Sequence, residues 1–526
     1  MSAAVALSRI TGLVRERMLA QWFGTGTVYE AYLVGFRIPN LTRDLFAEGA
    51  LSAAFVPQFT EYLAKGDRAA AQRLANLVAS ALVMLVGTMC LIGIAFAPAL
   101  VEVFASGFHR VPGKFELAIH MTRVMFPFLL LVALAAQVMG ILNACNRFLI
   151  PALSSSIFNI TSVALGLLLG FTFGPSIGLQ PVEGMAWGVV TGGFLQFACQ
   201  LPELHREGFR LRPAIDWSDP GLRHIGRMMG PAILGGAAVQ VNNLVNTNLA
   251  SQLVDPVRGA DGPVGWLSLA FRLMQLPIGL FGVAIANATL PAISRSVASG
   301  DQDEFRQTLS RSLGFVFLLT VPSAVGLAVL GRPVISAIFE GGKFESYDTH
   351  QTALALSFYS LGLVGYSVLK VLNPAFYAMR DSRTPMYVSL GTIAVNYAAA
   401  TLLLTNTGLG HVGLALALSV VSTFSGLVQF VLMRNRIGGI HGRSLASSLS
   451  RIVVASAAMG IAVSWINFWM EARYGLNRVA SLTSVALCIP AGFAIYYGVC
   501  RLLAVPELSL ATGALRRSKK GVQKAT

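Results

Sequence analysis

Long runs without a charged residue are the feature that most constrains this chain. Cutting the 526-residue sequence at Lys, Arg, Asp and Glu leaves uncharged runs at 74–101, 124–146, 148–182, 184–202, 228–254, 273–294, 312–331, 351–369, 384–433, 452–470 and 479–500. About 20 apolar residues in a helix cross the hydrocarbon core of a bilayer. Only 12% of the residues are charged, whereas globular proteins average about 25%. The sequence therefore predicts an all-α integral membrane protein.

The number of spans follows from these runs and from the first sixty residues. The run 384–433 is too long for one span and is broken by TNTGLGH at 405–411, so it counts twice. Two further hydrophobic segments that carry charges, about 3–23 and 28–53, are separated by the turn-like sequence GTGT. The total is about fourteen transmembrane helices.

The distribution of Lys and Arg predicts the orientation. With both termini in the cytoplasm, about 25 of the 39 basic residues fall on the cytoplasmic side and 8 on the other. The positive-inside rule therefore predicts cytoplasmic termini and a basic cytoplasmic tail at 504–526. A net charge of +15 would suggest nucleic acid in a soluble chain. Here asymmetric membrane loops explain it, so we expect membrane lipids and no nucleic acid as partners.

Two short matches indicate an internal repeat. VPQFTEYLAKGD at Val56–Asp67 resembles LPAISRSVASGD at Leu290–Asp301, and LQF at 195–197 and VQF at 428–430 have nearly the same offset. Many transporters consist of two similar halves. We expect two six-helix lobes in a pseudo-twofold arrangement, at 1–206 and 207–440. Two extra C-terminal helices follow at 441–503.

Six arginines remain inside the predicted spans. They are Arg9, Arg15, Arg17, Arg37, Arg43 and Arg272. An arginine at the bilayer centre costs about 2.5–3.5 kcal/mol on insertion scales, so such residues normally face a bundle interior or a wet cavity. Numbered in chain order, span 1 is about 3–23, span 2 is about 28–53 and span 8 contains WLSLAFRLMQLP. With a rise of about 1.5 Å per residue, Arg15, Arg37 and Arg272 lie near the middle of these three spans. These spans are predicted to share a cationic site at the interface of the lobes.

Two of these arginines directly precede an acidic residue in the sequence. Arg15 precedes Glu16, and Arg43 precedes Asp44. Each pair could be a structural ion pair instead of part of a ligand site. Arg272 has no acidic neighbour within its span, so it is the strongest ligand candidate.

Arg37 and Arg17 also have structural alternatives. Arg37 precedes Pro39, which bends helices, so this arginine could support the bend. Arg17 lies about 200° around the helix from Arg15, so both cannot face one cavity. A snorkelling or structural role is an equal alternative for Arg17.

Several segments together resemble one known family. They are SRITGLVRERMLAQWFGTG, FRIPNLTRDLFAEGALSAAFVP, GPAILGG and FRLMQLPIGLFGVAI. This combination closely resembles the MurJ (MviN) family of lipid II flippases, in the multidrug/oligosaccharidyl-lipid/polysaccharide exporter superfamily. The similarity runs through about residues 5–440, and the block PNLTRDLFAEGALSAAFVP is highly specific.

The resemblance implies fourteen spans, two lobes and particular site residues. The essential cavity arginines of the family fall on Arg9, Arg15, Arg43 and Arg272, and its acidic position in span 2 falls on Glu30. Spans 13 and 14 resemble the pair that forms a groove for the polyprenyl tail in this family. Together with Arg37, which comes from the residues alone, these side chains are the predicted substrate-binding set.

The sequence departs from the family at two places. Phe271 and Gln275 stand where relatives carry acidic residues around the arginine of span 8. Some relatives have a sodium site with carboxylates in spans 7 and 11, where this chain offers Asn243, Asn246 and Asn396. We therefore expect no sodium coupling, no metal and no cofactor.

The resemblance implies a transporter of the peptidoglycan precursor lipid II. Arginine suits the forked recognition of a pyrophosphate and of carboxylates. The expected mechanism is alternating access about the arginine-lined cavity, in the bacterial inner membrane. A flippase for another polyprenyl-pyrophosphate-linked oligosaccharide is the alternative. We expect no enzyme, because the seven His residues are scattered. We also expect a monomer that works beside the cell-wall synthesis machinery.

Overall fold

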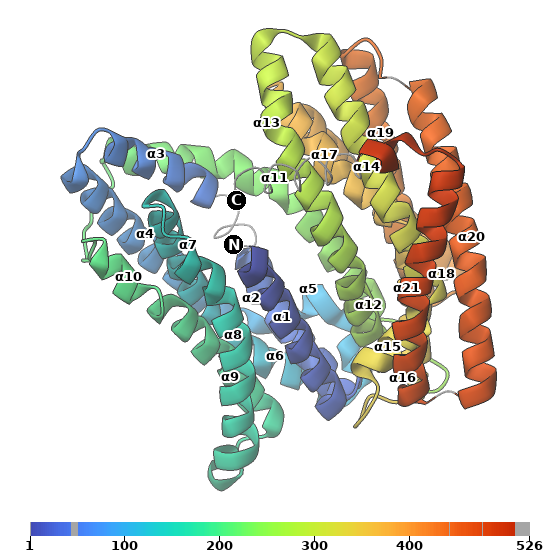
Figure 1. Ribbon diagram of the computed structural model, residues 1–526. Coiled ribbons are helices and arrows are strands. Elements are labelled where there is room, and N and C mark those ends of the chain that lie inside the picture. The colour runs from blue at the N-terminus through green and yellow to red at the C-terminus, as the bar shows by residue number, and fades with distance from the viewer. Residues whose placement is uncertain (1, 44–50, 441, 476, 511–526) are drawn as a thin grey trace, which may run out of the picture. The chain divides into compact units, whose positions relative to one another are not determined.

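The computed structural model describes residues 2–43, 51–440, 442–475 and 477–510 (Figure 1). Within these ranges the chain is helical, with only the isolated β-bridges Asp255–Gly259 and Gly341–Phe344. It forms two compact units, residues 1–265 and 266–526. The prediction of an all-α membrane protein is confirmed. The predicted Asp44 partner of Arg43 and most of the basic tail, residues 511–526, lie outside the described residues.

The helices of the first unit follow one another with short connections. They are α1 (Ser2–Phe23), α2 (Thr27–Arg43), α3 (Ser52–Ala64), α4 (Arg68–Ala95), α5 (Ala97–Ala105), α6 (Lys114–Met125), α7 (Phe128–Ala144), α8 (Leu149–Leu167), α9 (Pro181–Ala198), α10 (Leu201–Arg206) and α11 (Pro220–Ser251). A 3₁₀ turn, η2 (Ser106–Arg110), follows α5. A π-helical turn, η3 (Leu168–Phe173), and a 3₁₀ turn, η4 (Gly174–Ile177), extend α8.

The second unit begins within the first turn of α12. Its helices are α12 (Pro263–Pro277), α13 (Val283–Ser299), α14 (Gln302–Val329), α15 (Gly331–Phe339), α16 (Ser346–Ser360), α17 (Leu363–Ala378), α18 (Arg383–Asn406), α19 (His411–Arg436), α20 (Gly442–Tyr474) and α21 (Arg478–Leu502). A π-helical turn, η5 (Ile278–Gly282), joins α12 to α13.

Nine helical segments of the described chain are long and apolar enough to cross a membrane, or ten if the bent pair α16–α17 is one span. That pair bends by 46° at residues 361–362, whereas the sequence predicts a single span there. The other predicted spans correspond to α1, α2, α9 and α11. The described helices are therefore consistent with about fourteen spans.

The two units repeat the same succession of helix boundaries. Asp67 caps α4, where its carboxylate accepts from Ala70 N–H, and Asp301 caps α14 in the same way. These residues are 234 positions apart, and so are Gly66 and Gly300, which end the preceding helices at φ of +74° and +73°. Glycine adopts this left-handed conformation without steric cost. The motif noticed in the sequence is thus the junction between two helices in each unit.

Small residues bring α8 and α9 close together in the first unit, and the two helices lie side by side (Figure 1). A Cβ atom on Gly184 would be 2.2 Å from the backbone of Gly170, and one on Gly188 would be 2.3 Å from the Ser162 carbonyl oxygen. Small side chains let membrane helices approach in this manner, because packing replaces the hydrophobic driving force there.

The segment between α10 and α11 is attached to α4 by a ladder of hydrogen bonds. Three polar side chains one turn apart on α4 each accept from an alternate backbone N–H of the segment: Gln72 from Arg210, Asn76 from Arg212 and Ser80 from Ala214. Beyond the ladder, Arg73 forms an ion pair with Asp216 at 2.7 Å. Hydrogen bonds from Ser218, with a contribution from Arg73, lower the pKa of the Asp216 carboxyl.

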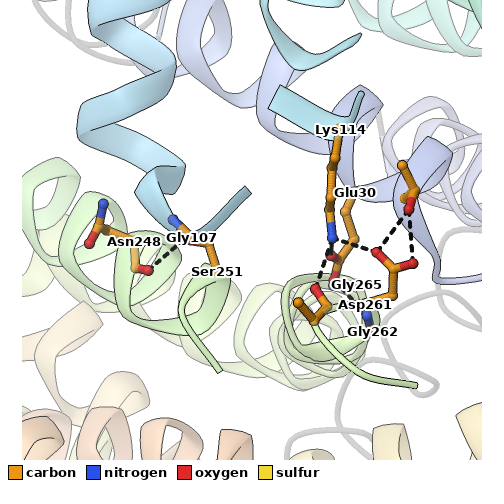
Figure 2. Close-up of polar contacts among 10 residues, drawn as sticks. Glu30, Gly107, Lys114, Asn248, Ser251, Asp261, Gly262 and Gly265 are labelled. Carbon is orange, nitrogen blue, oxygen red and sulfur yellow. Dashed lines mark hydrogen bonds and ion pairs between the residues drawn. The ribbon is translucent and has the colours of Figure 1, made fainter. Parts of the chain in front are cut away.

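The ladder leads into α11, which packs in the first unit against α3, α4 and α5. Its C-terminal end contacts η2, where the Ser251 hydroxyl accepts from Gly107 N–H at 3.2 Å (Figure 2). The boundary between the compact units therefore lies at 265/266, after the first helix of the segment 207–440. The division into six-helix lobes at 206/207 stays a prediction about the repeat.

Candidate functional site

Arg15 is the most enclosed of the predicted site arginines. It lies on α1 and is 5% exposed. Its guanidinium lies 5.3 Å from the ring centres of Phe36 and Phe158 and donates to Glu16 at 3.0 Å. The predicted ion pair between neighbours is thus present. The Arg15 Nε is buried and has no hydrogen-bond partner among the described residues, so the pair leaves donor capacity unused.

The other predicted site arginines of the first unit are half-buried. Arg9 lies two turns before Arg15 on α1, and Arg43 is the last residue of α2. Arg37 donates to the hydroxyl of Thr247 on α11. This bond joins α2 to α11, which gives Arg37 a structural contact in addition to the expected one with substrate.

Arg272 lies on α12 in the second unit and is half-buried. The preceding Phe271 packs edge-on against the ring of Tyr359 at 5.5 Å. Gln275 is exposed. The expectation that Arg272 shares one cavity with the arginines of spans 1 and 2 stays a prediction.

Glu30 lies in the first turn of α2 and is fully buried (Figure 2). Its Oε2 accepts from Lys114 Nζ at 2.6 Å. Its Oε1 accepts from the backbone N–H groups of Gly262 and Gly265, at 3.1 and 2.9 Å. These N–H groups belong to the start of α12, where a carboxylate is stabilised by the unpaired N–H groups and the helix dipole.

Lys114, the first residue of α6, connects this carboxylate to the α11–α12 connection. Its Nζ also contacts Asp261 at 2.6 Å and the Ala260 carbonyl oxygen at 3.0 Å. Thr27 donates to the same Asp261 carboxylate at 2.8 Å. Glu30 thus binds Lys114 and α12 within the first unit. These bonds do not bear on the predicted contact of Glu30 with substrate, which stays a prediction.

Lys114 is the residue of this network that sequence reasoning missed. Lys114 lies outside the uncharged runs, so it is one of the eight basic residues counted in loops on the non-cytoplasmic side. In the structure it is the first residue of α6 and is completely buried. One signal was available: Glu30 sits in an apolar span, and a buried carboxylate needs a cationic partner. The sequence does not indicate which basic residue that is, since Lys114 lies 84 positions away.

No group of three or more His, Cys, Asp or Glu side chains in the described ranges could hold a metal ion. The asparagines predicted at the sodium position are split between the units, with Asn243 and Asn246 on α11 and Asn396 on α18. Asn396 is fully buried, and neither of its amide atoms has a hydrogen-bond partner in the described part of the chain.

Comparisons with known proteins identify the family to which this chain belongs. A family model described as "Lipid II flippase MurJ" matches residues 19–483. The chain belongs to the MurJ family. It is 34% identical to the lipid II flippase MurJ of Burkholderia cenocepacia over 512 residues, which cover 95% of each chain. It is also 34% identical to the probable lipid II flippase MurJ of Vibrio cholerae, over 96% of this chain and 95% of that one.

Solved structures give the same fold. The chain is similar to "Lipid II flippase MurJ, inward closed conformation", with a TM-score of 0.77, 24% identity and coverage of 96% of this chain and 99% of that one. It also resembles an inward-facing multidrug resistance MATE family transporter, with a TM-score of 0.65, 15% identity and coverage of 83% and 95%. The MurJ family thus shares its helical framework with other transporters.

Proposed function

We propose that this protein is a lipid II flippase, a transporter and not an enzyme, that moves the precursor of peptidoglycan across the bacterial inner membrane. Family membership over most of the chain supports the substrate. The buried arginine on α1 carries the chemical argument. Substrate transfer proceeds by alternating access of an arginine-lined cavity, and no step requires a covalent intermediate.

The surroundings of Arg15 suit an anion that arrives and leaves. Two aromatic faces and Glu16 hold the guanidinium in place, so little conformational entropy is lost when a ligand binds. The unused Nε donor is available to a phosphate or carboxylate oxygen. Arg9, Arg37, Arg43, Arg272 and Glu30 complete the proposed substrate-binding set, and Glu30 also binds the start of α12.

The test is lipid II flipping by the purified chain in liposomes, together with rescue of a flippase-depleted strain. Arg272→Ala and Arg15→Ala should each lower flipping about tenfold to a hundredfold, as expected for a lost charge-assisted hydrogen bond. Arg272→Lys keeps the charge but loses the fork, so flipping should be clearly impaired. Arg17→Ala is the matched control on α1 and should be tolerated. Full activity of Arg272→Ala at matched membrane abundance would refute the cationic site.

The same liposomes distinguish the alternative substrate. A flippase for another polyprenyl-pyrophosphate-linked oligosaccharide would move that lipid faster than lipid II. The named relatives favour lipid II. Faster transport of an O-antigen-type lipid by the wild-type chain would overturn the assignment.

Both termini are proposed to be cytoplasmic, from the distribution of 25 against 8 basic residues. Single cysteines at Ser218 and Val257 test this, since both positions are exposed. An impermeant thiol reagent on intact cells, in a background without the native cysteines, should label only Val257→Cys. Labelling of Ser218→Cys alone would invert the topology.

The extra helices α20 and α21 are proposed to bind the polyprenyl tail. Neither has a charge between Arg451 and Glu471 or between Arg478 and Arg501, so these stretches contain no cation to pair with a phosphate. Photocrosslinkers placed there should capture the polyprenyl chain, and capture of the sugar-peptide part would contradict this role. We also propose that the protein is monomeric and works beside the cell-wall synthesis machinery.

A further inference from the structure

A cavity of about 700 Å³ lies within the second unit, apart from the predicted arginine site. Residues of α14, α17, α19 and α20 line it, together with Leu361 and Ile440. The lining is apolar apart from Thr423 and two arginines, and it contains no acidic residue. No residue of α21 takes part, which separates this cavity from the groove proposed between α20 and α21.

Two glycines that line the cavity let α17 and α19 approach each other closely. A Cβ atom on Gly365 would be 2.6 Å from the backbone of Ser422, and one on Gly426 would be 3.4 Å from the Gly365 carbonyl oxygen. The backbones of the two helices are therefore in close contact at this point, which forms one wall of the cavity. Leu361 and Leu427, both 60% exposed, lie at its edge. The cavity is thus open toward the surface that a membrane protein presents to lipid.

The two arginines lie at one end. Arg434 is in the last turn of α19 and Arg443 in the first turn of α20, joined by a short connection. Both are exposed. Among the described residues, neither arginine side chain has a hydrogen bond or an ion pair. Nearby arginines differ, because Arg436 pairs with Asp381 and Arg451 donates to the carbonyl oxygens of Leu503 and Ala504.

The length of the cavity indicates which kind of molecule fits it. From Arg434 to Thr423 the lining extends eleven residues along α19, which is about 16 Å at 1.5 Å per residue. This is about half of the ~30 Å hydrocarbon core, the depth that the acyl chain of a lipid in one leaflet reaches. A polyprenyl chain is much longer than this depth. Two cations at the interfacial end complement a phosphate group.

We propose that this cavity binds an anionic phospholipid of the bilayer, with an acyl chain between α17, α19 and α20 and its phosphate between Arg434 and Arg443. This site is separate from the transported substrate. It depends only on the membrane location of the chain, so failure of the proposed flippase activity would leave it standing.

The probe is phosphatidylglycerol with a diazirine at the end of one acyl chain, at low abundance in phosphatidylcholine nanodiscs containing the full-length protein. After irradiation, mass spectrometry should place adducts on the cavity-lining residues of α17 and α19. Arg434→Gln and Arg443→Gln should each reduce this labelling about fivefold. Arg501→Gln, an exposed arginine of α21 outside the cavity, should leave it unchanged.

A second variant addresses the cavity itself. Ala446 is an exposed lining residue of α20, so Ala446→Phe should fill the space and abolish adducts without removing a charge. Three results would overturn the proposal: equal labelling by the matched phosphatidylcholine probe, unchanged labelling in the Arg434→Gln/Arg443→Gln double variant, or displacement of the probe by equimolar undecaprenyl phosphate. The last result would assign the cavity to the tail of a transported lipid.

Discussion

Helices α8 and α18 occupy equivalent positions in the two repeats but have different surroundings. They begin at Leu149 and Arg383, again 234 positions apart. In the first unit α8 packs against α1, where the Asn159 amide donates to the Ser8 carbonyl oxygen at 3.1 Å. In the 18-residue window of highest hydropathy, 39% is buried in the segment Leu149–Ile177, which contains α8. The corresponding share in α18 is 17%.

Exposed side chains such as Tyr387, Tyr397 and Leu402 account for this difference in α18. In chain order, the helix that corresponds to α1 is α11, and α11 packs in the first unit. The repeat therefore preserves helix lengths and junctions, which local residues determine, but not the lateral packing of each helix.

The polar contacts of the repeats differ as well. Lys114 and Asp348 are 234 positions apart, and each lies in the first turn of an equivalent helix. Lys114 forms an ion pair with Glu30, whereas Asp348 accepts a hydrogen bond from the indole of Trp266 at 3.0 Å. The first unit has a buried ionic contact where the second joins a carboxylate to a neutral donor.

The largest loss of stability is expected when this ionic contact is removed. Lys114→Ala leaves the Glu30 carboxylate buried without its cation, which should cost about 3–5 kcal/mol of stability. Asp348→Asn retains an acceptor for Trp266 and should cost about 1 kcal/mol. Thermal unfolding of the purified protein in detergent measures both. The double variant Lys114→Met/Glu30→Gln should recover part of the loss. Equal melting temperatures of Lys114→Ala and Asp348→Asn would show that the ionic contact of the first unit contributes no more to stability than the hydrogen bond of the second.

A smaller and equal effect is expected at the repeated junctions. Asp67→Ala and Asp301→Ala each remove the side-chain cap of a 28-residue helix, at a cost of about 1 kcal/mol. Asp→Asn at either site should be nearly silent, because asparagine also caps. Denaturant or thermal melts compare the four variants. A loss at only one junction would show that the boundaries are not energetically equivalent.

The smallest effect concerns α8 and α18 directly. Asn159→Leu removes the hydrogen bond to α1, and such bonds between membrane helices contribute about 0.6 kcal/mol. The equivalent position on α18 is Ile393, which has no polar side chain, so Ile393→Leu should be neutral. Hydrogen exchange of the α1 backbone should increase only in the first variant. An unchanged exchange rate for Asn159→Leu would show that other α1–α8 contacts suffice.

Local signals made the helical fold and the repeat predictable. A glycine at a helix end followed by a capping aspartate depends on neighbouring residues alone, so Gly66–Asp67 and Gly300–Asp301 could be recognised in the sequence. The Arg15–Glu16 contact was open to sequence reasoning for the same reason, because the partners are adjacent.

Contacts between distant segments were not predictable. A lysine outside the uncharged runs is assigned to a loop, so the hydropathy pattern could not place Lys114 beside Glu30. It could not assign α11 to the first unit either, since an apolar helix of this length fits many neighbours equally well. The hydrogen bond from Arg37 to Thr247 depends on that placement, and it was missed with it.

The ladder between α4 and residues 210–214 determines where this chain can be cut or extended. Thirteen residues separate α10 from α11, and a free segment of that length would be a flexible tether of about 20 Å. Such tethers tolerate proteolysis and inserted domains. Here alternate N–H groups are bound to Gln72, Asn76 and Ser80, so the segment behaves as part of the α4 surface. A reporter domain inserted at Pro213 would have to detach it, whereas one inserted in the exposed turn at Gly408 would not.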